Sequence, residues 1–403
     1  MAARQVYIVA LLLGFSLLTY IDRTILSVSA PSIVREFHFS EIEMGWIFSA
    51  FQIAYTLAMT PGGRWADRFG PRRVLAAHGL GSGALTAALA VVSSFPLMMA
   101  LRAGFGVFTA PIYPAAGRMN SNWMPERLRT SVQSIVHSGA GLGGAISPIL
   151  FTWMIAALGW RASFVAAGAV TVAFALLWYV SVADHPAGEH AAAAPPPAPP
   201  SRWRELLGDR NLQLLTIGFA ALDYFEYIFF YWLYYYLGEI RKLPQAETAA
   251  YTTMPFVAWL VMMPIGGRLA DVAVARMGAQ RGLRAMAISF VALSAGCLFG
   301  ALAVEPILAV VTLLSLALGF CAIADVIFWA AAIRISGRHV GAACGIMNTG
   351  GNLGGSLAPV LTPLIASAFG WSAGLWVGGA VALVGVACWL FVDSDQRVEL
   401  RDW

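Results

Sequence analysis

Long apolar runs, separated by short polar or Pro/Gly-rich breaks, follow one another along almost the whole chain. A hydrocarbon core about 30 Å thick needs roughly 20 apolar residues per helical crossing, and the runs are about that long or longer. They predict twelve transmembrane helices, near residues 5–32, 43–62, 74–95, 97–118, 127–157, 161–183, 211–238, 247–266, 283–303, 306–333, 340–368 and 373–392. The chain is therefore expected to be an all-α membrane protein.

Composition narrows the class of protein further. Of the 403 residues, 59% are hydrophobic and 11% are charged, whereas about a quarter of residues are charged in soluble domains. The first apolar run, from Val6 past Pro31, carries charges and is longer than the apolar core of a signal peptide. We interpret it as a retained first helix.

Nothing in the chain predicts an enzyme. The sequence contains no nucleotide-binding loop, nucleophile elbow or cluster of metal ligands. Its four cysteines lie in apolar stretches of the second half without Cys-x-x-Cys spacing, which favours helix packing over a disulfide or a metal site. We expect no enzymatic activity, no cofactor and no metal.

Basic residues fall unevenly on the two sides of the predicted helices. If the chain starts inside, most of the 25 Lys and Arg residues fall on one side, and the positive-inside rule then puts both termini in the cytoplasm. This topology accounts for the net charge of +4 without a nucleic-acid partner. We expect a multi-pass protein of a bacterial inner membrane, monomeric and surrounded by the lipid bilayer.

The two halves of the chain repeat each other. The sequence Pro-Gly-Gly-Arg-Trp-Ala-Asp at Pro61–Asp67 returns as Ile-Gly-Gly-Arg-Leu-Ala-Asp at Ile265–Asp271. A Gly-rich stretch at Ser138–Pro148 likewise returns at Thr349–Pro359. Parallel six-helix repeats are typical of transporters in which two bundles rock around a site near the membrane midplane.

An Ala/Pro-rich segment at residues 185–206 separates the halves. Such a composition cannot build a packed core, so we expect it to form a cytoplasmic linker. The predicted six-helix bundles then occupy residues 1–184 and 207–403.

A charged segment follows the second predicted helix. Its sequence, Gly63-Arg-Trp-Ala-Asp67-Arg68-Phe-Gly70-Pro-Arg72-Arg73, resembles the loop signature of the major facilitator superfamily, with a truncated copy at Gly267–Asp271. We expect a short loop in which the Asp67 carboxylate caps a helix end and pairs with arginines in one access state only. The alternative is a basic turn that merely obeys the positive-inside rule. The resemblance implies a gating loop that comprises Gly63, Asp67, Arg68, Gly70, Arg72 and Asp271.

Three charged residues stand out well inside the predicted helices of the first half: Asp22, Arg23 and Arg102. An ionisable group in mid-membrane costs several kcal/mol unless it is paired or hydrated, so each of them is a candidate functional residue. Tyr20 and Arg23 recur at helical spacing and share one face, whereas Asp22 points in another direction.

The stretches Tyr20-Ile-Asp22-Arg23-Thr-Ile-Leu-Ser-Val-Ser-Ala-Pro31 and Arg102–Pro114 resemble the anion:cation symporter family. This family includes sugar-acid, hexuronate and tartrate carriers and is related to vesicular glutamate and sialic-acid transporters. The resemblance implies that Arg23 and Arg102 bind the substrate carboxylate and that Tyr20 and Tyr55 donate hydrogen bonds to it. Guanidinium groups suit this role because their planar fork holds a carboxylate by two bonds. The alternative is that Arg102 forms a buried pair with Asp22.

The sequence departs from the family at the usual proton carrier. Proton-coupled members have Glu seven residues after the arginine of span four, whereas this chain has Thr109. Asp22 is then the main candidate for proton coupling. His137, in span five, is the second candidate because histidine titrates near working pH. The alternative for His137 is a neutral residue that only donates or accepts hydrogen bonds.

Polar residues of the second half remain open to several interpretations. Asn348 and Asn352 lie one helical turn apart and suit either substrate binding or hydrogen bonding between helices. Two acids in the aromatic span seven, Asp223 and Glu226, and Asp325 in span ten have no assigned role.

These residues together predict a secondary transporter that imports a small organic anion, a sugar acid or another carboxylate, together with a proton. The alternatives are a proton-exchanging multidrug efflux carrier, an uncoupled organic-anion facilitator or exchanger, and a transporter-like receptor. Replacing Arg102 with alanine separates the first two classes, because only the anion carrier needs this positive charge.

Overall fold

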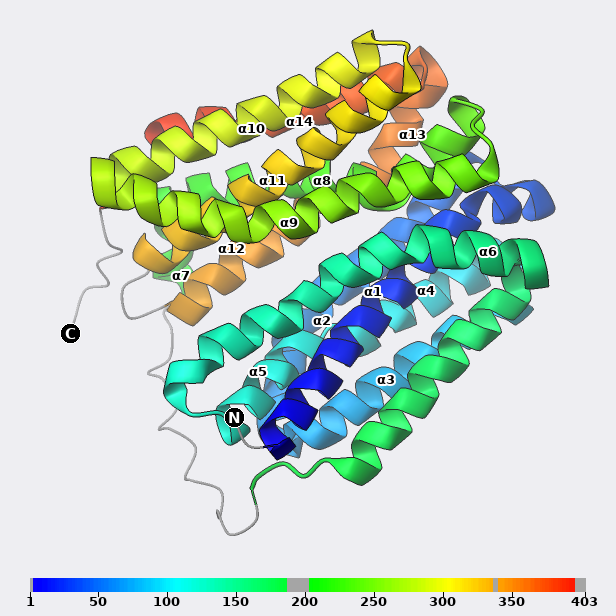
Figure 1. Ribbon diagram of the computed structural model, residues 1–403, viewed down its shortest axis with the longest axis horizontal. Coiled ribbons are helices and arrows are strands. Elements are labelled where there is room, and N and C mark those ends of the chain that lie inside the picture. Colours follow the sequence, from blue (N-terminus) through cyan, green and yellow to red (C-terminus); the bar gives the residue numbers. More distant parts are fainter. Residues whose placement is uncertain (1–2, 187–202, 336–339, 396–403) are drawn as a thin grey trace. The chain divides into compact units, whose positions relative to one another are not determined.

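The computed structural model describes residues 3–186, 203–335 and 340–395, and all regular secondary structure among them is helical (Figure 1). The first half contains α1 (Ala3–Phe37), α2 (Glu41–Phe69), α3 (Pro71–Ala88), the 3₁₀ turn η1 (Leu89–Val91), α4 (Phe95–Thr109), α5 (Ile112–Trp123) and α6 (Glu126–Ser181). The second half contains α7 (Trp203–Gly208), α8 (Arg210–Tyr235), the π turn η2 (Tyr236–Ile240), α9 (Gln245–Met277), α10 (Ala279–Ala303), α11 (Ile307–Ile335), α12 (Val340–Gly355), α13 (Ala358–Phe369) and α14 (Trp371–Phe391).

The helices agree with the predicted crossings. Ten helical segments of the described chain are long and apolar enough to span a membrane. One of them, in α6, bends at Gly159 and so contains two predicted crossings. Together with α2, this gives the twelve expected spans. The prediction of an all-α membrane protein is therefore confirmed.

Glycines at helix junctions show the internal repeat in the backbone itself. Gly70 and Gly278, which precede α3 and α10, have φ angles of 84° and 79°. Gly159 and Gly370, which precede the sixth and twelfth crossings, have φ angles of 78° and 87°. Side chains other than glycine rarely adopt such angles, so each tight junction requires a residue without Cβ. The same sharp turns therefore occur at matching places in both halves.

The structure divides into two compact units that do not follow the halves strictly. Unit 1 comprises Met1–Ala194 and Leu237–Thr253, and unit 2 comprises Pro195–Tyr236 and Met254–Trp403. In unit 1, α6 packs along α1 and α3. In unit 2, α8 packs against α12 and α14, and α10 packs against α11.

The segment Leu237–Thr253 belongs to unit 1 through specific contacts. Arg35 at the end of α1 forms an ion pair with Glu239 of η2 at 3.3 Å. Thr253 donates a hydrogen bond to the carbonyl oxygen of Ala145 at 3.0 Å. Residues 187–202 of the expected linker lie outside the described residues, and the bundle limits at 184 and 207 stay a prediction.

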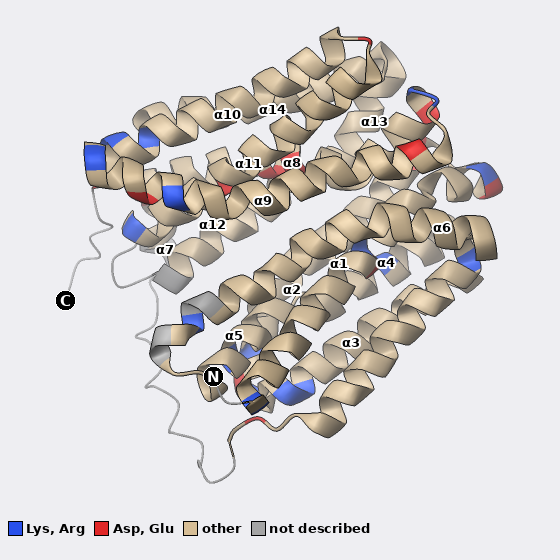
Figure 2. Cartoon of the chain, viewed as in Figure 1, with Lys and Arg blue, Asp and Glu red and all other residues tan. Residues whose placement is uncertain are grey.

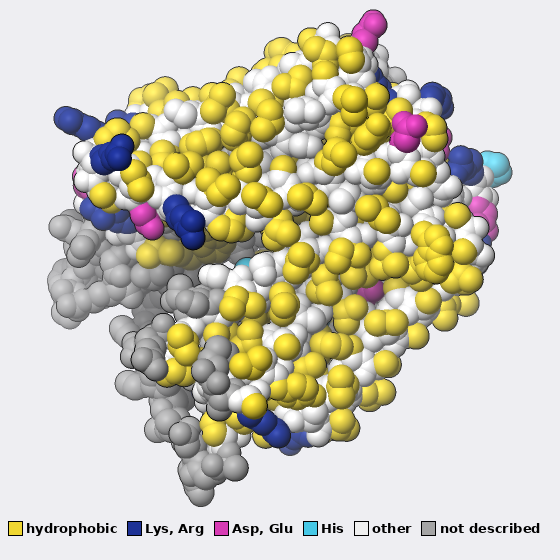
Figure 3. All heavy atoms as spheres, in the orientation of Figure 1, with side chains coloured by type: hydrophobic (Ala, Val, Ile, Leu, Met, Phe, Trp, Pro, Cys, Tyr) yellow, Lys and Arg dark blue, Asp and Glu magenta, His cyan; other side chains and the backbone are white. Residues whose placement is uncertain are grey.

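The outer surface of the helices is apolar. Figure 3 shows hydrophobic side chains spread over the flanks of the helices, and large ones such as Val91, Val180 and Phe369 are more than three-quarters exposed. Basic residues gather instead near helix ends, for example where α9 ends and α10 begins (Figure 2). An apolar flank with charged ends matches the polarity profile of a bilayer.

Helices α2 and α4 meet in backbone contact at Gly106. A Cβ atom on Gly106 would lie 2.4 Å from the carbonyl oxygen of Phe51 and 2.8 Å from the backbone nitrogen of Tyr55. No side chain fits there without moving the two helices apart. This contact sets the distance between Phe51 of α2 and Arg102 of α4.

We predict that Gly106→Ala lowers stability by about 1–3 kcal/mol, because overpacking displaces α2 from α4. Thermal unfolding of the detergent-solubilised protein measures this loss. Gly296→Ala is the matched control, since no atom lies within 4 Å of a Cβ added there. Equal unfolding temperatures for the two variants would contradict the predicted contact.

Candidate functional site

Arg23 lies in the middle of α1 and is almost completely buried, with 5% of its surface exposed. Its guanidinium donates a hydrogen bond to Oε1 of Gln52 at 2.8 Å. The guanidinium carbon lies 5.4 Å from the ring centre of Tyr20 and 5.0 Å from that of Phe51. The amide accepts a hydrogen bond and the faces of the rings attract a cation, so these contacts orient the guanidinium.

Three tyrosines form a less buried layer next to Arg23. Tyr20, Tyr55 and Tyr113 are each half-buried, and Tyr113 is close enough to the other two and to Arg23 to interact electrostatically. The hydroxyl of Tyr113 lies 3.1 Å from Oγ of Ser16. Phenol groups both donate and accept hydrogen bonds, so this layer suits an oxygen-rich solute beside a fixed positive charge.

His137 belongs to the same surface. Its ring stacks on Tyr113 with centres 4.2 Å apart and an angle of 13° between the planes. Its Nδ1 lies 2.9 Å from the carbonyl oxygen of Gln133, one turn earlier on α6, and its side chain is exposed. The structure thus brings His137 beside the tyrosines that surround Arg23.

Arg102 lies deeper than this layer. It is completely buried, with its guanidinium carbon 4.9 Å from the ring centres of both Phe51 and Phe105. Asp22, also buried, is within electrostatic range of Arg102 and accepts a hydrogen bond from Thr171 at 2.8 Å. Arg102 is thus close to Asp22, as in the alternative that the sequence left open, and the hydrogen bond seen for Asp22 comes from Thr171. Arg23 is the arginine next to the tyrosine layer.

Thr109 occupies the position where proton-coupled family members carry Glu. Its side chain is buried and donates to the carbonyl oxygen of Phe105 at 2.8 Å, within its own helix. A threonine hydroxyl folded back in this way carries no titratable proton.

Several neighbours of the site were not predicted from the sequence. Gln52 and Phe51 contact Arg23 from the next helix, α2, and Thr171 contacts Asp22 from α6, 149 residues along the chain. Tyr113 had one sequence signal, because it follows Arg102 by eleven residues, about three helical turns. Nε2 of His78 lies 3.0 Å from Oγ1 of Thr19 on α1. A single histidine in an apolar run forms no sequence pattern that would have predicted this contact.

In the second half, Asn352 links two helices. Its Oδ1 accepts a hydrogen bond from the hydroxyl of Tyr227 at 2.9 Å, and its Nδ2 donates to Oδ1 of Asn348 at 3.0 Å. The alternative of interhelical hydrogen bonding therefore describes Asn352, which is buried, whereas Asn348 is half-buried.

The three unassigned acids gather around Cys321. Asp223, Glu226 and Asp325 all lie within electrostatic range of its thiol, which is 3.9 Å from Oε2 of Glu226. In the described part of the chain, no three His, Cys, Asp or Glu residues are placed to hold a metal ion.

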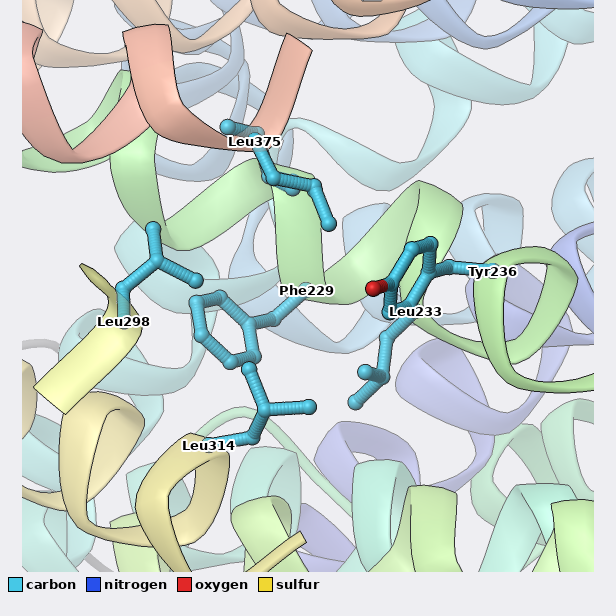
Figure 4. Close-up of a pocket in the computed structure, with 7 residues that line it drawn as sticks. Phe229, Leu233, Tyr236, Leu298, Leu314 and Leu375 are labelled. Carbon is cyan, nitrogen blue, oxygen red and sulfur yellow. The ribbon is translucent and has the colours of Figure 1, made fainter. Parts of the chain in front are cut away.

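A small apolar gap also lies in unit 2 (Figure 4). Its volume is about 10 Å³, and it is lined by Ile228, Phe229, Leu233, Tyr236, Leu298, Leu314 and Leu375. This space is a packing defect between α8, η2, α10, α11 and α14, and it is too small for an organic ligand.

The expected gating loop is wrong in its local structure, because its residues are helical. Helix α2 continues to Phe69, so Gly63, Asp67 and Arg68 lie on its last turns, and only Gly70 forms the turn. Asp271 is likewise an exposed residue inside α9. Backbone hydrogen bonds sustain a helix beyond the apolar run that predicted its end.

The expected cap is also a different residue. Asp184 accepts a hydrogen bond from the backbone nitrogen of Arg72 at 2.8 Å, at the start of α3. The Arg72 guanidinium donates to the carbonyl oxygen of Tyr179 at 2.6 Å and 3.0 Å. Asp67 instead lies 3.8 Å from the guanidinium of Arg118 and remains largely exposed. The pairing expected of Asp67 is therefore present, whereas Asp184 provides the cap.

The sequence of the chain is similar to those of known transporters. A model described as Major Facilitator Superfamily matches residues 12–333 and 275–402. The chain is 31% identical to the probable sulfoacetate transporter SauU of Cupriavidus necator, over 96% of this chain and 93% of that protein. It is 28% identical to the D-galactonate transporter of Escherichia coli (94% and 93% covered) and to the hexuronate transporter of Bacillus subtilis (93% and 92% covered).

Solved structures share the fold. A bacterial homologue of the human lysosomal transporter Spinster, in an inward-facing and occupied conformation, superposes with a TM-score of 0.83 at 15% identity, covering 96% of each chain. A point mutant of the nucleoside transporter NupG gives a TM-score of 0.74 at 13% identity, covering 96% of this chain and 99% of that chain. At these identities, the likeness extends to the fold alone.

Proposed function

Because the chain belongs to the major facilitator superfamily, we propose that it carries a small carboxylate across a bacterial inner membrane by alternating access, together with a proton. The protein is a membrane transporter related to carriers of sugar acids and other carboxylates, and it is not an enzyme. Sugar acids, sulfoacetate and related small hydroxy acids form the proposed substrate class.

One observation carries the proposal: Arg23 is a buried cation that donates a hydrogen bond to Gln52 and lies beside Tyr20, Tyr55 and Tyr113. A cation inside a membrane bundle is costly, so its retention favours a negatively charged partner. The guanidinium fork matches a carboxylate, and the phenols match hydroxyl groups next to it. Arg102 adds positive potential from behind, and Asn348 is the proposed contribution of the second half.

The direct test is an uptake screen in proteoliposomes with and without an imposed pH gradient. The panel contains sulfoacetate, D-galactonate, a hexuronate and a cationic dye. We expect at least one of the acids to accumulate and its uptake to rise when the outside is acidic. Transport of the dye without any acid would support the efflux alternative, and acid exchange without accumulation would support an uncoupled exchanger.

Proton coupling is assigned to Asp22 and His137. Asp22 is buried against Thr171 and near Arg102, so its protonation state alters the field around the arginines. His137 stacks on Tyr113 at the surface of the proposed site, where a bound proton would add positive charge close to the substrate.

We predict that His137→Asn reduces pH-driven uptake by roughly tenfold, within the usual range for coupling between two bound ligands. Counterflow exchange, which needs no net proton movement, should fall much less. His38→Asn is the control, because His38 is exposed at the end of α1 and has a φ angle of 56° that asparagine tolerates. An equal loss of uptake and exchange in His137→Asn would reject the coupling role.

We propose a monomer with both termini in the cytoplasm and six-helix bundles at 1–184 and 207–403, because the basic residues favour this orientation. Asp67, Arg68, Gly70 and Arg72 would then act at the cytoplasmic ends of α2 and α3. Breaking and forming contacts such as Asp67–Arg118 would accompany the change of access.

A further inference from the structure

A groove on unit 1 lies outside the proposed substrate site. It runs between α2, α3 and the broken helix α4–α5 and has a volume of about 410 Å³. It is lined by Trp65, Phe69, Arg73, Val74, Ala77, His78, Val107, Phe108 and Pro111. Pockets of this size hold small organic ligands or parts of larger ones.

The walls of the groove are apolar and open to the outside of the bundle. Trp65, Phe69, Val107 and Phe108 are each more than one-third exposed. In a bundle that crosses a membrane, exposed apolar flanks face acyl chains.

Close helix contacts hold these walls in place. A Cβ atom on Gly81 would lie 2.1 Å from the ring of Phe108, and one on Gly62 would lie 3.0 Å from Pro111. Both glycines therefore pack directly on residues that line the groove. The shape of the groove follows from this helix packing.

One end of the groove carries a positive charge. Arg73 is exposed in the first turn of α3, and none of the described residues forms an ion pair with it. The adjacent Arg72 is occupied, since it bonds the carbonyl oxygen of Tyr179. From Arg73, the lining continues along α3 through Val74 and Ala77 to His78. This stretch of helix is about 7 Å long.

We propose that this groove binds an anionic phospholipid, with one acyl chain between the apolar walls and the phosphate at Arg73. The charge and the apolar lining complement the two ends of such a molecule. Trp65 near the charged end fits the usual place of indole rings at the membrane interface. The inference depends on unit 1 being embedded in a membrane and does not depend on the proposed substrate.

The groove is connected to the substrate site through His78. Its Nδ1 lies 3.0 Å from the carbonyl oxygen of Phe108, and its Nε2 lies 3.0 Å from Oγ1 of Thr19. Thr19 precedes Arg23 by one turn of α1. A lipid packed against Phe108 and His78 therefore stabilises the packing of α3 and α4 next to the helix that carries Arg23.

The test is a titration of lipid into the purified full-length protein, with the number of bound lipids measured by native mass spectrometry. Phosphatidylglycerol and phosphatidylcholine with identical acyl chains are titrated separately. One arginine at a membrane surface contributes about 1 kcal/mol to binding an anionic lipid, so we expect about fivefold tighter binding of the first phosphatidylglycerol.

Three variants separate the contributions. Arg73→Gln should abolish the preference for phosphatidylglycerol, and Ala77→Trp, which fills the groove, should weaken the binding of both lipids. Arg281→Gln should behave as wild type, because Arg281 is exposed at the matching place of the second half, three residues after Gly278, and does not line the groove. Thermal unfolding verifies that each variant is folded.

Two outcomes would overturn the lipid site. The first is equal affinity of the wild-type protein for the two lipids, which would indicate only an apolar surface. The second is an unchanged preference in Arg73→Gln, which replaces an exposed side chain and should fold normally. A protein that binds the lipids as expected but does not transport carboxylates would contradict the substrate proposal and leave the lipid site supported.

Discussion

Replacing Arg23 with glutamine is expected to reduce carboxylate transport by at least about 30-fold. Removing one partner of a buried, hydrogen-bonded charge pair costs about 2–5 kcal/mol, which corresponds to roughly 30-fold to several thousand-fold in affinity. Glutamine keeps a hydrogen-bond donor for Gln52 but provides neither the positive charge nor the planar fork. Initial rates of acid uptake into proteoliposomes, measured over a range of substrate concentrations, give this loss.

Two companion variants sharpen this prediction. Arg23→Lys keeps the charge but binds a carboxylate as a point charge, so its transport should lie between wild type and Arg23→Gln. Arg276→Gln is the matched control, because Arg276 is exposed at the end of α9. Wild-type uptake by Arg23→Gln would remove the basis of the proposed carboxylate site.

Replacing Arg102 with methionine is expected to destabilise the fold and to abolish transport. It removes the cation that lies within electrostatic range of the buried Asp22 carboxylate, and an uncompensated buried charge costs about 3–5 kcal/mol. Thr171 donates one hydrogen bond to Asp22, which offsets only part of this cost. The measurements are thermal unfolding in detergent and counterflow exchange in proteoliposomes.

The double variant Arg102→Met with Asp22→Asn separates a structural role from a role in binding. Removing both charges should restore stability, since a neutral amide tolerates burial better than a carboxylate. If Arg102 contributes to the binding of the anion, counterflow remains absent in the stable double variant. Recovery of counterflow would assign Arg102 to the pairing with Asp22 alone.

Residues of the first unit show how much of the site the sequence predicted. Tyr20 and Arg23 lie one turn apart on α1, so their proximity follows from helix geometry and is seen in the structure. Their contacts with Gln52 and Phe51 depend on how α2 is rotated and placed against α1. No local pattern encodes that rotation, because it results from packing along the whole length of both helices.

The capping of α3 shows the same limit. Asp67 stands close to α3 in the sequence and was the natural candidate, yet Asp184, more than 100 residues away, accepts the bond from Arg72. The end of α6 passes beside the start of α3, and this neighbourhood exists only after the bundle has formed.

By itself, the sequence determined the number of helices, their duplication and the buried charges, since lipid imposes a minimum length on every apolar run and a cost on every charge within it. The tertiary structure decided which arginine lies beside the tyrosines, which acid lies near the other arginine and where helices end. These outcomes depend on helix rotation and register, which are set by close packing between residues far apart in the chain.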